Sequence, residues 1–290
     1  MIPMKKIVKK SLTLLSVYYA NLLEYRSELI FWVLAGSLPI IMMGIWMQAA
    51  DSGKFAFKSV DFARYFFAVF LARQITVVWV IYDFEKEVLE GKLSPKLLQP
   101  LDPVWHHVAN HLAERVARMP FVLLLAALFF ILYPQAFWLP SITNLFLFIL
   151  AAIMVFALRF IIQYTFAMFA FWTEKAAALE SLWLLFFVFL SGLIAPLDVF
   201  PENIRNIVMF TPFPYMINFP ASILVGLPVD LTRGFLSISG WFLIFFGANR
   251  FFMAQRTEKI FRYGSLIIRN LISSLYGNYN SLRTQKSLYS

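Results

Sequence analysis

The chain has 290 residues, of which 61% are hydrophobic and 14% charged, with a mean hydropathy of +0.73. Soluble domains carry about 25% charged residues, so this composition excludes an ordinary soluble protein and predicts an all-α integral membrane protein. The net charge is +9, but the basic residues flank apolar runs, which favours membrane topology and a lipid bilayer over nucleic acid as the partner.

Residues 1–28 precede the first apolar segment. Over residues 4–27, charged side chains such as Lys9 and Arg26 alternate with apolar ones, which predicts an amphipathic helix in the membrane interface. A plain juxtamembrane tether is the alternative. The polar preface and the apolar run after it are both too long for a signal peptide, so we expect an uncleaved anchor.

Six apolar segments each approach or exceed the roughly 20 residues that a spanning helix needs. They predict a six-span membrane domain over residues 29–253. The segments are 29–49, 60–82, 119–139, 143–172, 179–197 and 232–252. If the N-terminus is cytoplasmic, the inner connecting segments hold eighteen basic residues and the outer ones five. This asymmetry predicts that both termini are cytoplasmic.

A polar segment at 83–118 separates the second and third spans, on the predicted cytoplasmic side. Its first part is charged, Gly91 is a helix stop signal, and Ser94-Pro95 is a start signal for another helix. Leu97 and Leu98 follow as an apolar pair. Such a segment between two spans indicates a docking site for a soluble partner.

The outer segment 196–231 is rich in proline but also apolar. We expect a short re-entrant or surface helical hairpin packed against the spans, with an ordinary loop as the alternative. Its prolines are Pro196, Pro201, Pro212, Pro214, Pro220 and Pro228. The chain then ends in a basic tail, 254–290, which we expect to be cytoplasmic.

Three polar residues lie inside predicted spans: Arg73 in the second, and Arg159 with Gln163 in the fourth. Charge in the hydrocarbon region is costly and usually faces protein or a water-filled path. The three residues therefore indicate the lining of a translocation path or an internal clamp for an anionic headgroup. A structural hydrogen-bonding role, or snorkelling, is the alternative.

The sequence offers no catalytic or metal-binding pattern. His106, His107 and His111 lie close together but lack the order and partners of a metal site, so we interpret them as interfacial. Without cysteine, disulfides and thiol chemistry are excluded. No nucleotide-binding glycine loop or nucleophile elbow is present, so we expect neither an enzyme nor a cofactor in this chain. A partner would have to supply any energy for transport.

Two passages resemble a known family. The first is EVLEGKLSPKLLQP at 87–100; the second combines FWTEK at 171–175, LSGLIAPLDVFP at 190–201, TPFPY at 211–215 and LVG at 224–226. Over about residues 5–264 the chain resembles type-2 permeases of ATP-binding-cassette (ABC) exporters. More narrowly, it is similar to a short bacterial branch of uncharacterised ABC-type permeases.

The resemblance implies a complex in the bacterial inner membrane. Two permease subunits, identical or paralogous, would pair with two ABC ATPase subunits that bind ATP and Mg. Segment 83–118 would be the coupling loop, with its coupling helix at 83–91. The hairpin would be an outer gate, for which the candidates are Pro196, Pro201, Pro212 and Pro214. The predicted ATPase-docking residues are Phe84, Glu85, Glu87, Val88, Leu89 and Glu90.

The resemblance further implies export of an amphipathic, lipid-like or drug-like substrate. A non-catalytic membrane scaffold or assembly factor that docks another soluble protein through the same segment is the alternative function.

Overall fold

The computed structural model describes residues 4–51, 53, 55, 57–99, 101–171, 173 and 175–253. The predicted tail 254–290 lies outside the described residues. Two compact units make up the chain, Met1–Phe246 and Gly247–Ser290, and the arrangement below is that of the first. The described residues form helices and connecting segments, with no strand among them, so the all-α prediction is confirmed.

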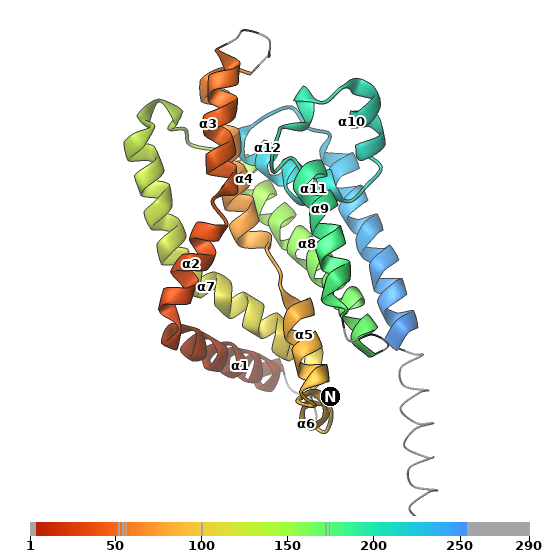
Figure 1. Cartoon of the computed structure of the whole chain (residues 1–290). Helices are drawn as coiled ribbons and strands as arrows, with labels where there is room; N and C mark the ends of the chain where they lie inside the picture. Colours follow the sequence, from red (N-terminus) through yellow and green to blue (C-terminus); the bar gives the residue numbers. More distant parts are fainter. Residues whose placement is uncertain are drawn as a thin grey trace, which may run out of the picture. The chain divides into compact units, whose positions relative to one another are not determined.

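The helices follow one another with short connections. Their bounds are α1 Met4–Glu24, α2 Arg26–Ala35, α3 Leu38–Ala50, α4 Ser59–Thr76, α5 Val80–Leu89, α6 Leu93–Leu97, α7 Pro103–Leu132, η1 Pro134–Ala136, α8 Ile142–Ala167, η2 Met168–Phe171, α9 Ala177–Leu190, η3 Leu197–Val199, α10 Glu202–Val208, α11 Phe213–Met216, α12 Asn218–Val225 and a last helix, Leu231–Met253. In Figure 1, α6 lies near one end of the first unit and α10 at the other; we name these the α6 end and the α10 end.

Within the described residues, five helical segments are long and apolar enough to cross a membrane, as a multi-pass membrane protein requires. They are Ser27–Ala50, Ser59–Leu89, Pro103–Leu132, Ile142–Phe171 and Leu231–Met253. The remaining predicted span, 179–197, coincides with α9, an apolar helix of 14 residues. At about 1.5 Å per residue α9 is roughly 21 Å long, less than the hydrocarbon thickness of about 30 Å.

Helix α7 begins at Pro103, well before the predicted start of the third span at residue 119. The Asp102 side chain accepts a hydrogen bond of 3.0 Å from the Val104 amide, and Pro103 occupies the first turn. Both features favour a helix start. Pro120 lies inside the helix without ending it, and the structure ends α7 at Leu132, before Pro134.

The first two spans are each divided into two helices. The sequence pattern predicts one span in each place, but α2 and α3 meet at Gly36-Ser37, and α4 and α5 meet at Val77–Trp79. Figure 1 shows both changes of direction. The first break has a local cause, because Gly36-Ser37 is a glycine–serine pair and Pro39 lies in the first turn of α3. The second break contains neither proline nor glycine, so its cause lies outside the local sequence.

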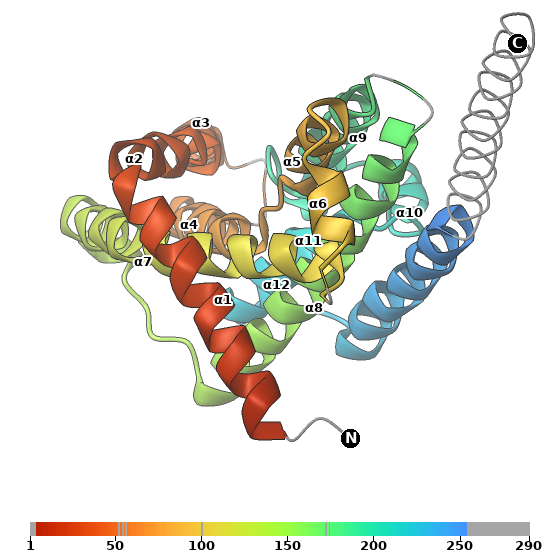
Figure 2. The same ribbon diagram turned by 90° about the horizontal axis from the view of Figure 1, so that it is seen from below.

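Helix α4 forms the centre of the core. Its aromatic side chains Phe62, Tyr65, Phe66 and Phe70 are fully buried, and helices α3, α8 and α12 pack against it. Helix α1 lies at the α6 end and crosses α7, as Figure 2 shows from below.

The segment between α9 and α12 turns at Gly192, where φ is +89°. The Tyr65 hydroxyl lies 2.9 Å from the Gly192 carbonyl oxygen and 2.8 Å from Asn218 Oδ1, which joins this turn to α4. A Cβ at position 192 would lie 2.5 Å from the Tyr65 hydroxyl and 2.8 Å from Asn218 Cβ. Glycine is therefore required here by conformation and by space.

Gly192→Ala should lower the free energy of unfolding by about 3 kcal/mol, because a left-handed non-glycine residue and an overfilled site each cost roughly 1–3 kcal/mol. Thermal unfolding of the purified chain in detergent measures the change. Gly44→Ala is the matched control: nothing lies within 4 Å of its added Cβ, and it sits inside α3. Equal melting temperatures for the two variants would contradict the assigned role of Gly192.

Candidate functional site

Beside α1, the α6 end includes α5, α6 and the first turns of α7, and it contains all six predicted docking residues. Phe84 of α5 is fully buried. Its ring packs edge-on against Tyr164 and Phe171, with centroids 5.5 and 5.7 Å away. Phe84 therefore fixes α5 to α8 and η2, contrary to the expectation of a side chain on an exposed docking face.

Glu85 links α5 to α9. Its Oε2 accepts a hydrogen bond of 2.6 Å from the amide of Ala177, the first residue of α9. A carboxylate at a helix N-terminus satisfies a free amide and interacts favourably with the helix dipole. This hydrogen bond joins α5 to α9, although 92 residues separate the two partners in sequence.

Glu87 of α5 contacts charged and polar side chains of α6 and α7. Its Oε1 lies 2.5 Å from Lys96 Nζ, and its Oε2 lies 3.6 Å from His107 Nε2. These contacts connect α5 with α6 and α7. Glu85 and Glu87 are therefore engaged inside the chain, which leaves Leu89 and Glu90 as the predicted docking residues with exposed side chains; Val88 is half-buried.

The α5–α6 tip, which we define as Leu89, Leu97 and Leu98, carries exposed apolar side chains. Leu98 is 89% exposed and Leu89 56%. A polar cavity of about 270 Å³ lies behind the tip, lined by Tyr18, Asp83, Lys86, Glu87, Glu90, Lys92, Lys96, His106, His107 and Asn110. The tip thus combines apolar side chains with surrounding charges of both signs.

Tyr18 brings α1 to the same cavity. Its hydroxyl lies 3.1 Å from His106 Nδ1. Burial, followed by the negative charges of Glu87 and Asp83, raises the pKa of the Tyr18 hydroxyl above its usual value, so the hydroxyl keeps its proton and can donate. Helix α1 is in this way attached to α7 beside α5.

The two inner histidines of α7 are not interfacial, contrary to the interpretation made from the sequence. His107 and His111 are buried, and His111 Nε2 accepts a hydrogen bond of 3.0 Å from the Trp79 amide. Groups of three or more potential metal ligands are absent from the described residues. His111 instead satisfies a backbone donor at the break between α4 and α5.

Arg115 of α7 also binds backbone atoms at the break between α4 and α5. Its guanidinium donates to the carbonyl oxygens of Ile75, at 2.5 Å, and of Val77 and His111. Carbonyls released by an interrupted helix must find partners at membrane depth. Sequence reasoning missed Arg115 because a third span starting at residue 119 places it in a loop; recognising Asp102-Pro103 as a helix start would have placed it on a span.

The polar residues predicted for the translocation path do not share one cavity. Gln163 Nε2 donates to Glu180 Oε1 at 2.8 Å, and both residues are buried where α8 faces α9. Arg159 stacks over the Phe187 ring at 4.4 Å. Arg73 lines a small cavity with Arg118, and that cavity includes neither Arg159 nor Gln163.

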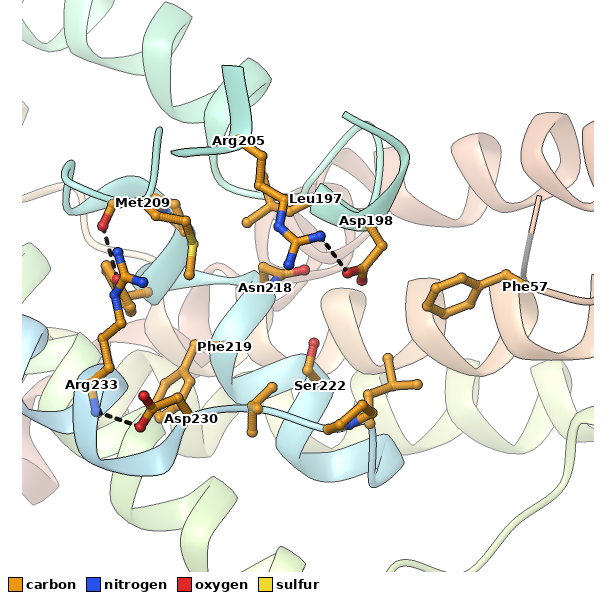
Figure 3. A pocket seen from close by; sticks show the side chains of 15 residues that line it. Phe57, Leu197, Asp198, Arg205, Met209, Asn218, Phe219, Ser222, Asp230 and Arg233 are labelled. Atoms are coloured by element: carbon orange, nitrogen blue, oxygen red, sulfur yellow. Dashed lines mark hydrogen bonds and ion pairs between the residues drawn. The ribbon is translucent and has the colours of Figure 1, made fainter. Parts of the chain in front are cut away.

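The α10 end holds a larger cavity of about 490 Å³ (Figure 3). Asp198 and Arg205 face one another across part of it, with Asp198 Oδ1 3.5 Å from Arg205 Nη1. Asp230 Oδ1 accepts a hydrogen bond of 2.9 Å from the Arg233 backbone amide. Pro214 also lines this cavity. One ion pair and two further charged side chains, Asp230 and Arg233, among apolar walls suit an amphipathic molecule.

The predicted gate prolines have a local role in the helices of this segment. Pro201 and Pro212 are the residues directly before α10 and α11, and Pro214 lies in the first turn of α11. Pro196 precedes η3 and is buried. Proline before or in the first turn sets the backbone for a helix start, so these four residues divide the segment into short helices.

Comparison with known proteins identifies the family to which the chain is similar. The family model described as ABC-2 family transporter protein matches residues 40–259. The matched range contains α4 to α12, including the α5–α6 tip and the cavity at the α10 end. A search of curated proteins finds no match.

Proposed function

The chain belongs to the ABC-2 family of transporter proteins, and from this premise we propose that it is the permease subunit of an ABC exporter, driven by ATP that a separate subunit hydrolyses. The observation that carries the proposal is the α5–α6 tip. It presents exposed leucines on a segment that Phe84, Glu85 and Glu87 hold rigidly from inside.

An ATPase would bind at this tip. Apolar anchors surrounded by polar groups are the usual composition of a binding hot spot, and Leu98 is the most exposed anchor. ATP-driven closure of the two ATPases would displace the tip. Because Glu85 ties α5 to α9, the displacement would reach the spans as a rigid-body movement.

The proposal also includes the orientation of the chain in the membrane, the sixth span, the exit gate, the path and the substrate. The α6 end would face the cytoplasm of a bacterium, with both termini on that side and α1 in the interface. Helix α9 would be the sixth span, extended by residues 191–195. The segment at 196–231 would form a re-entrant hairpin whose prolines gate the exit, and Arg73, Arg159 and Gln163 would lie along the path within a pair of permeases. The substrate would be amphipathic, lipid-like or drug-like.

Leu98→Glu tests the dock. Burying one leucine contributes about 2 kcal/mol, so the variant should bind the partner ABC ATPase roughly 30-fold more weakly. The two proteins are co-expressed, solubilised and purified through a tag on the permease, and the bound ATPase is quantified.

The matched control is Ile207→Glu, which places the same charge on an apolar side chain that is 70% exposed at the α10 end. This variant should retain the ATPase. Retention of the ATPase by Leu98→Glu at the wild-type level would place the dock elsewhere.

A further inference from the structure

A small cavity lies where the two helix breaks meet. The break between α2 and α3 and the break between α4 and α5 contribute adjacent walls, and the rings of Trp32 and Trp79 lie 5.7 Å apart beside it. The cavity measures about 60 Å³ and is lined by Trp32, Ala35, Gly36, Arg73, Gln74, Val77, Trp79 and Arg118. Arg73 stands near the midpoint of the Ser59–Leu89 segment, so the cavity lies at membrane depth.

Among the residues that line this cavity, the two buried side-chain atoms without a partner in the described part of the chain are both donors. Trp79 Nε1 and Arg118 Nε are buried without a hydrogen-bond acceptor among the described residues. Arg118 is itself only 4% exposed, and its Nη2 is used by Glu114. Indole and guanidinium groups cannot accept hydrogen bonds, so they cannot satisfy one another.

The charges around the cavity are unbalanced. Glu114 neutralises Arg118, whereas Arg73 forms no hydrogen bond or ion pair with any described residue. Gln74 cannot balance this charge because its side chain is neutral; its amide nitrogen donates to the Val33 carbonyl oxygen at 3.1 Å. An unneutralised arginine at this depth costs at least about 2.5 kcal/mol. Water could accept the hydrogen bonds but could not supply the missing negative charge.

We infer that this cavity binds the phosphoryl group of an anionic ligand, with Arg73, Trp79 and Arg118 as donors. A water needs roughly 10–15 Å³ of such space, so about 60 Å³ admits a compact group of four or five heavy atoms. Trp32 and Ala35, at the edge of the cavity, are exposed on the surface of the chain. An acyl chain attached to the phosphoryl group could therefore extend outward along α2.

The inference rests on the membrane location of the chain and not on the ATPase dock. The phosphoryl group could belong to a phospholipid or to a free phosphate ion, and the experiment separates the two. Full-length protein is reconstituted in nanodiscs with equal amounts of phosphatidylglycerol and phosphatidylcholine. Native mass spectrometry then measures which lipid the released protein retains, and thermal unfolding is followed with and without inorganic phosphate.

The wild-type protein should retain phosphatidylglycerol preferentially. Arg73→Gln should reduce that preference about tenfold, and Trp79→Phe about fivefold, because the second variant removes a neutral donor and keeps the ring against Trp32. Arg250→Gln, at an exposed arginine of the last helix that lines none of the cavities described above, is the control and should change nothing. The conservative Trp79→Phe variant keeps the test decisive if Arg73→Gln fails to fold.

Two results support the site and one overturns it. A preference for phosphatidylglycerol that both variants lose identifies a lipid headgroup. No lipid preference, but stabilisation by inorganic phosphate in the wild type alone, identifies a soluble anion. If lipid retention and the response to phosphate are the same in the wild type and both variants, water fills the cavity and the inference is wrong.

Discussion

Arg115→Ala should leave most of the protein unfolded or unstable after solubilisation. The guanidinium donates to three carbonyl oxygens, two of which belong to Ile75 and Val77 at the break between α4 and α5. Each carbonyl left without a partner costs about 1–3 kcal/mol, and no bulk water replaces the donor at membrane depth. A total loss of about 4 kcal/mol is a large part of the 5–15 kcal/mol that typically stabilises a protein.

The measurement is the yield of monodisperse protein and its thermal unfolding in detergent. Arg64→Gln provides the control, because Arg64 also donates to two carbonyl oxygens, those of Ala136 and Phe137, at 3.2 and 3.1 Å. Phe137 is exposed, so water can take over there and the variant should lose less than about 1 kcal/mol. Similar losses in the two variants would show that Arg115 does not sustain the break. Arg115→Lys should fall between wild type and alanine, since one ammonium group lacks the planar fork.

The second large effect should follow from Glu85→Lys, which separates α5 from α9. The substitution removes the acceptor of the Ala177 amide and places a positive charge at the N-terminus of α9. We expect the contact between α5 and α9 to lose about 2–3 kcal/mol of stabilisation. This corresponds to a roughly 100-fold drop in the population with the two helices in contact, relative to the population with them apart. Glu85→Gln keeps an oxygen acceptor and should retain most of the contact.

The absence of cysteine from the sequence makes a direct measurement possible. Spin labels on cysteines introduced at Tyr82 and Leu182, both exposed, report the distance between α5 and α9 by pulsed electron paramagnetic resonance. Wild type and Glu85→Gln should give one narrow distribution, and Glu85→Lys a broad one. A narrow distribution in the lysine variant would mean that other contacts, such as those of Phe84, hold the two helices together.

The sequence predicted the membrane class and the positions of most spans, because apolar composition over 20 residues is a local property. The early start of α7 was also accessible, since Asp102-Pro103 is a recognisable start signal. The break between α2 and α3 was accessible too, from Gly36-Ser37 and Pro39, but the break between α4 and α5 was not. Val77 and Val78 are typical of any apolar run, and the residue that binds the carbonyl oxygens at this break is Arg115, 38 residues beyond Val77.

The docking prediction was also limited by contacts between residues that lie far apart in the sequence. Glu85, Glu87 and Glu90 look equivalent in sequence, yet Glu90 reaches solvent while Glu85 contacts a residue 92 positions away. Exposure depends on what the fold brings near a side chain. For the same reason, the cavity at Arg73 could not be inferred from Arg73 alone, because its other donors come from α7 and from the segment between α4 and α5.

The break between α4 and α5 has a consequence for how the chain tolerates substitution. Its shape is held by side chains of α7 that bind backbone atoms, so the side chains at Val77 and Val78 contribute little to it beyond bulk. In a deep mutational scan, exchanges among apolar residues at 77 and 78 should survive, whereas almost any change at His111 or Arg115 should be lost. Residues of the third span therefore determine the geometry of the second span.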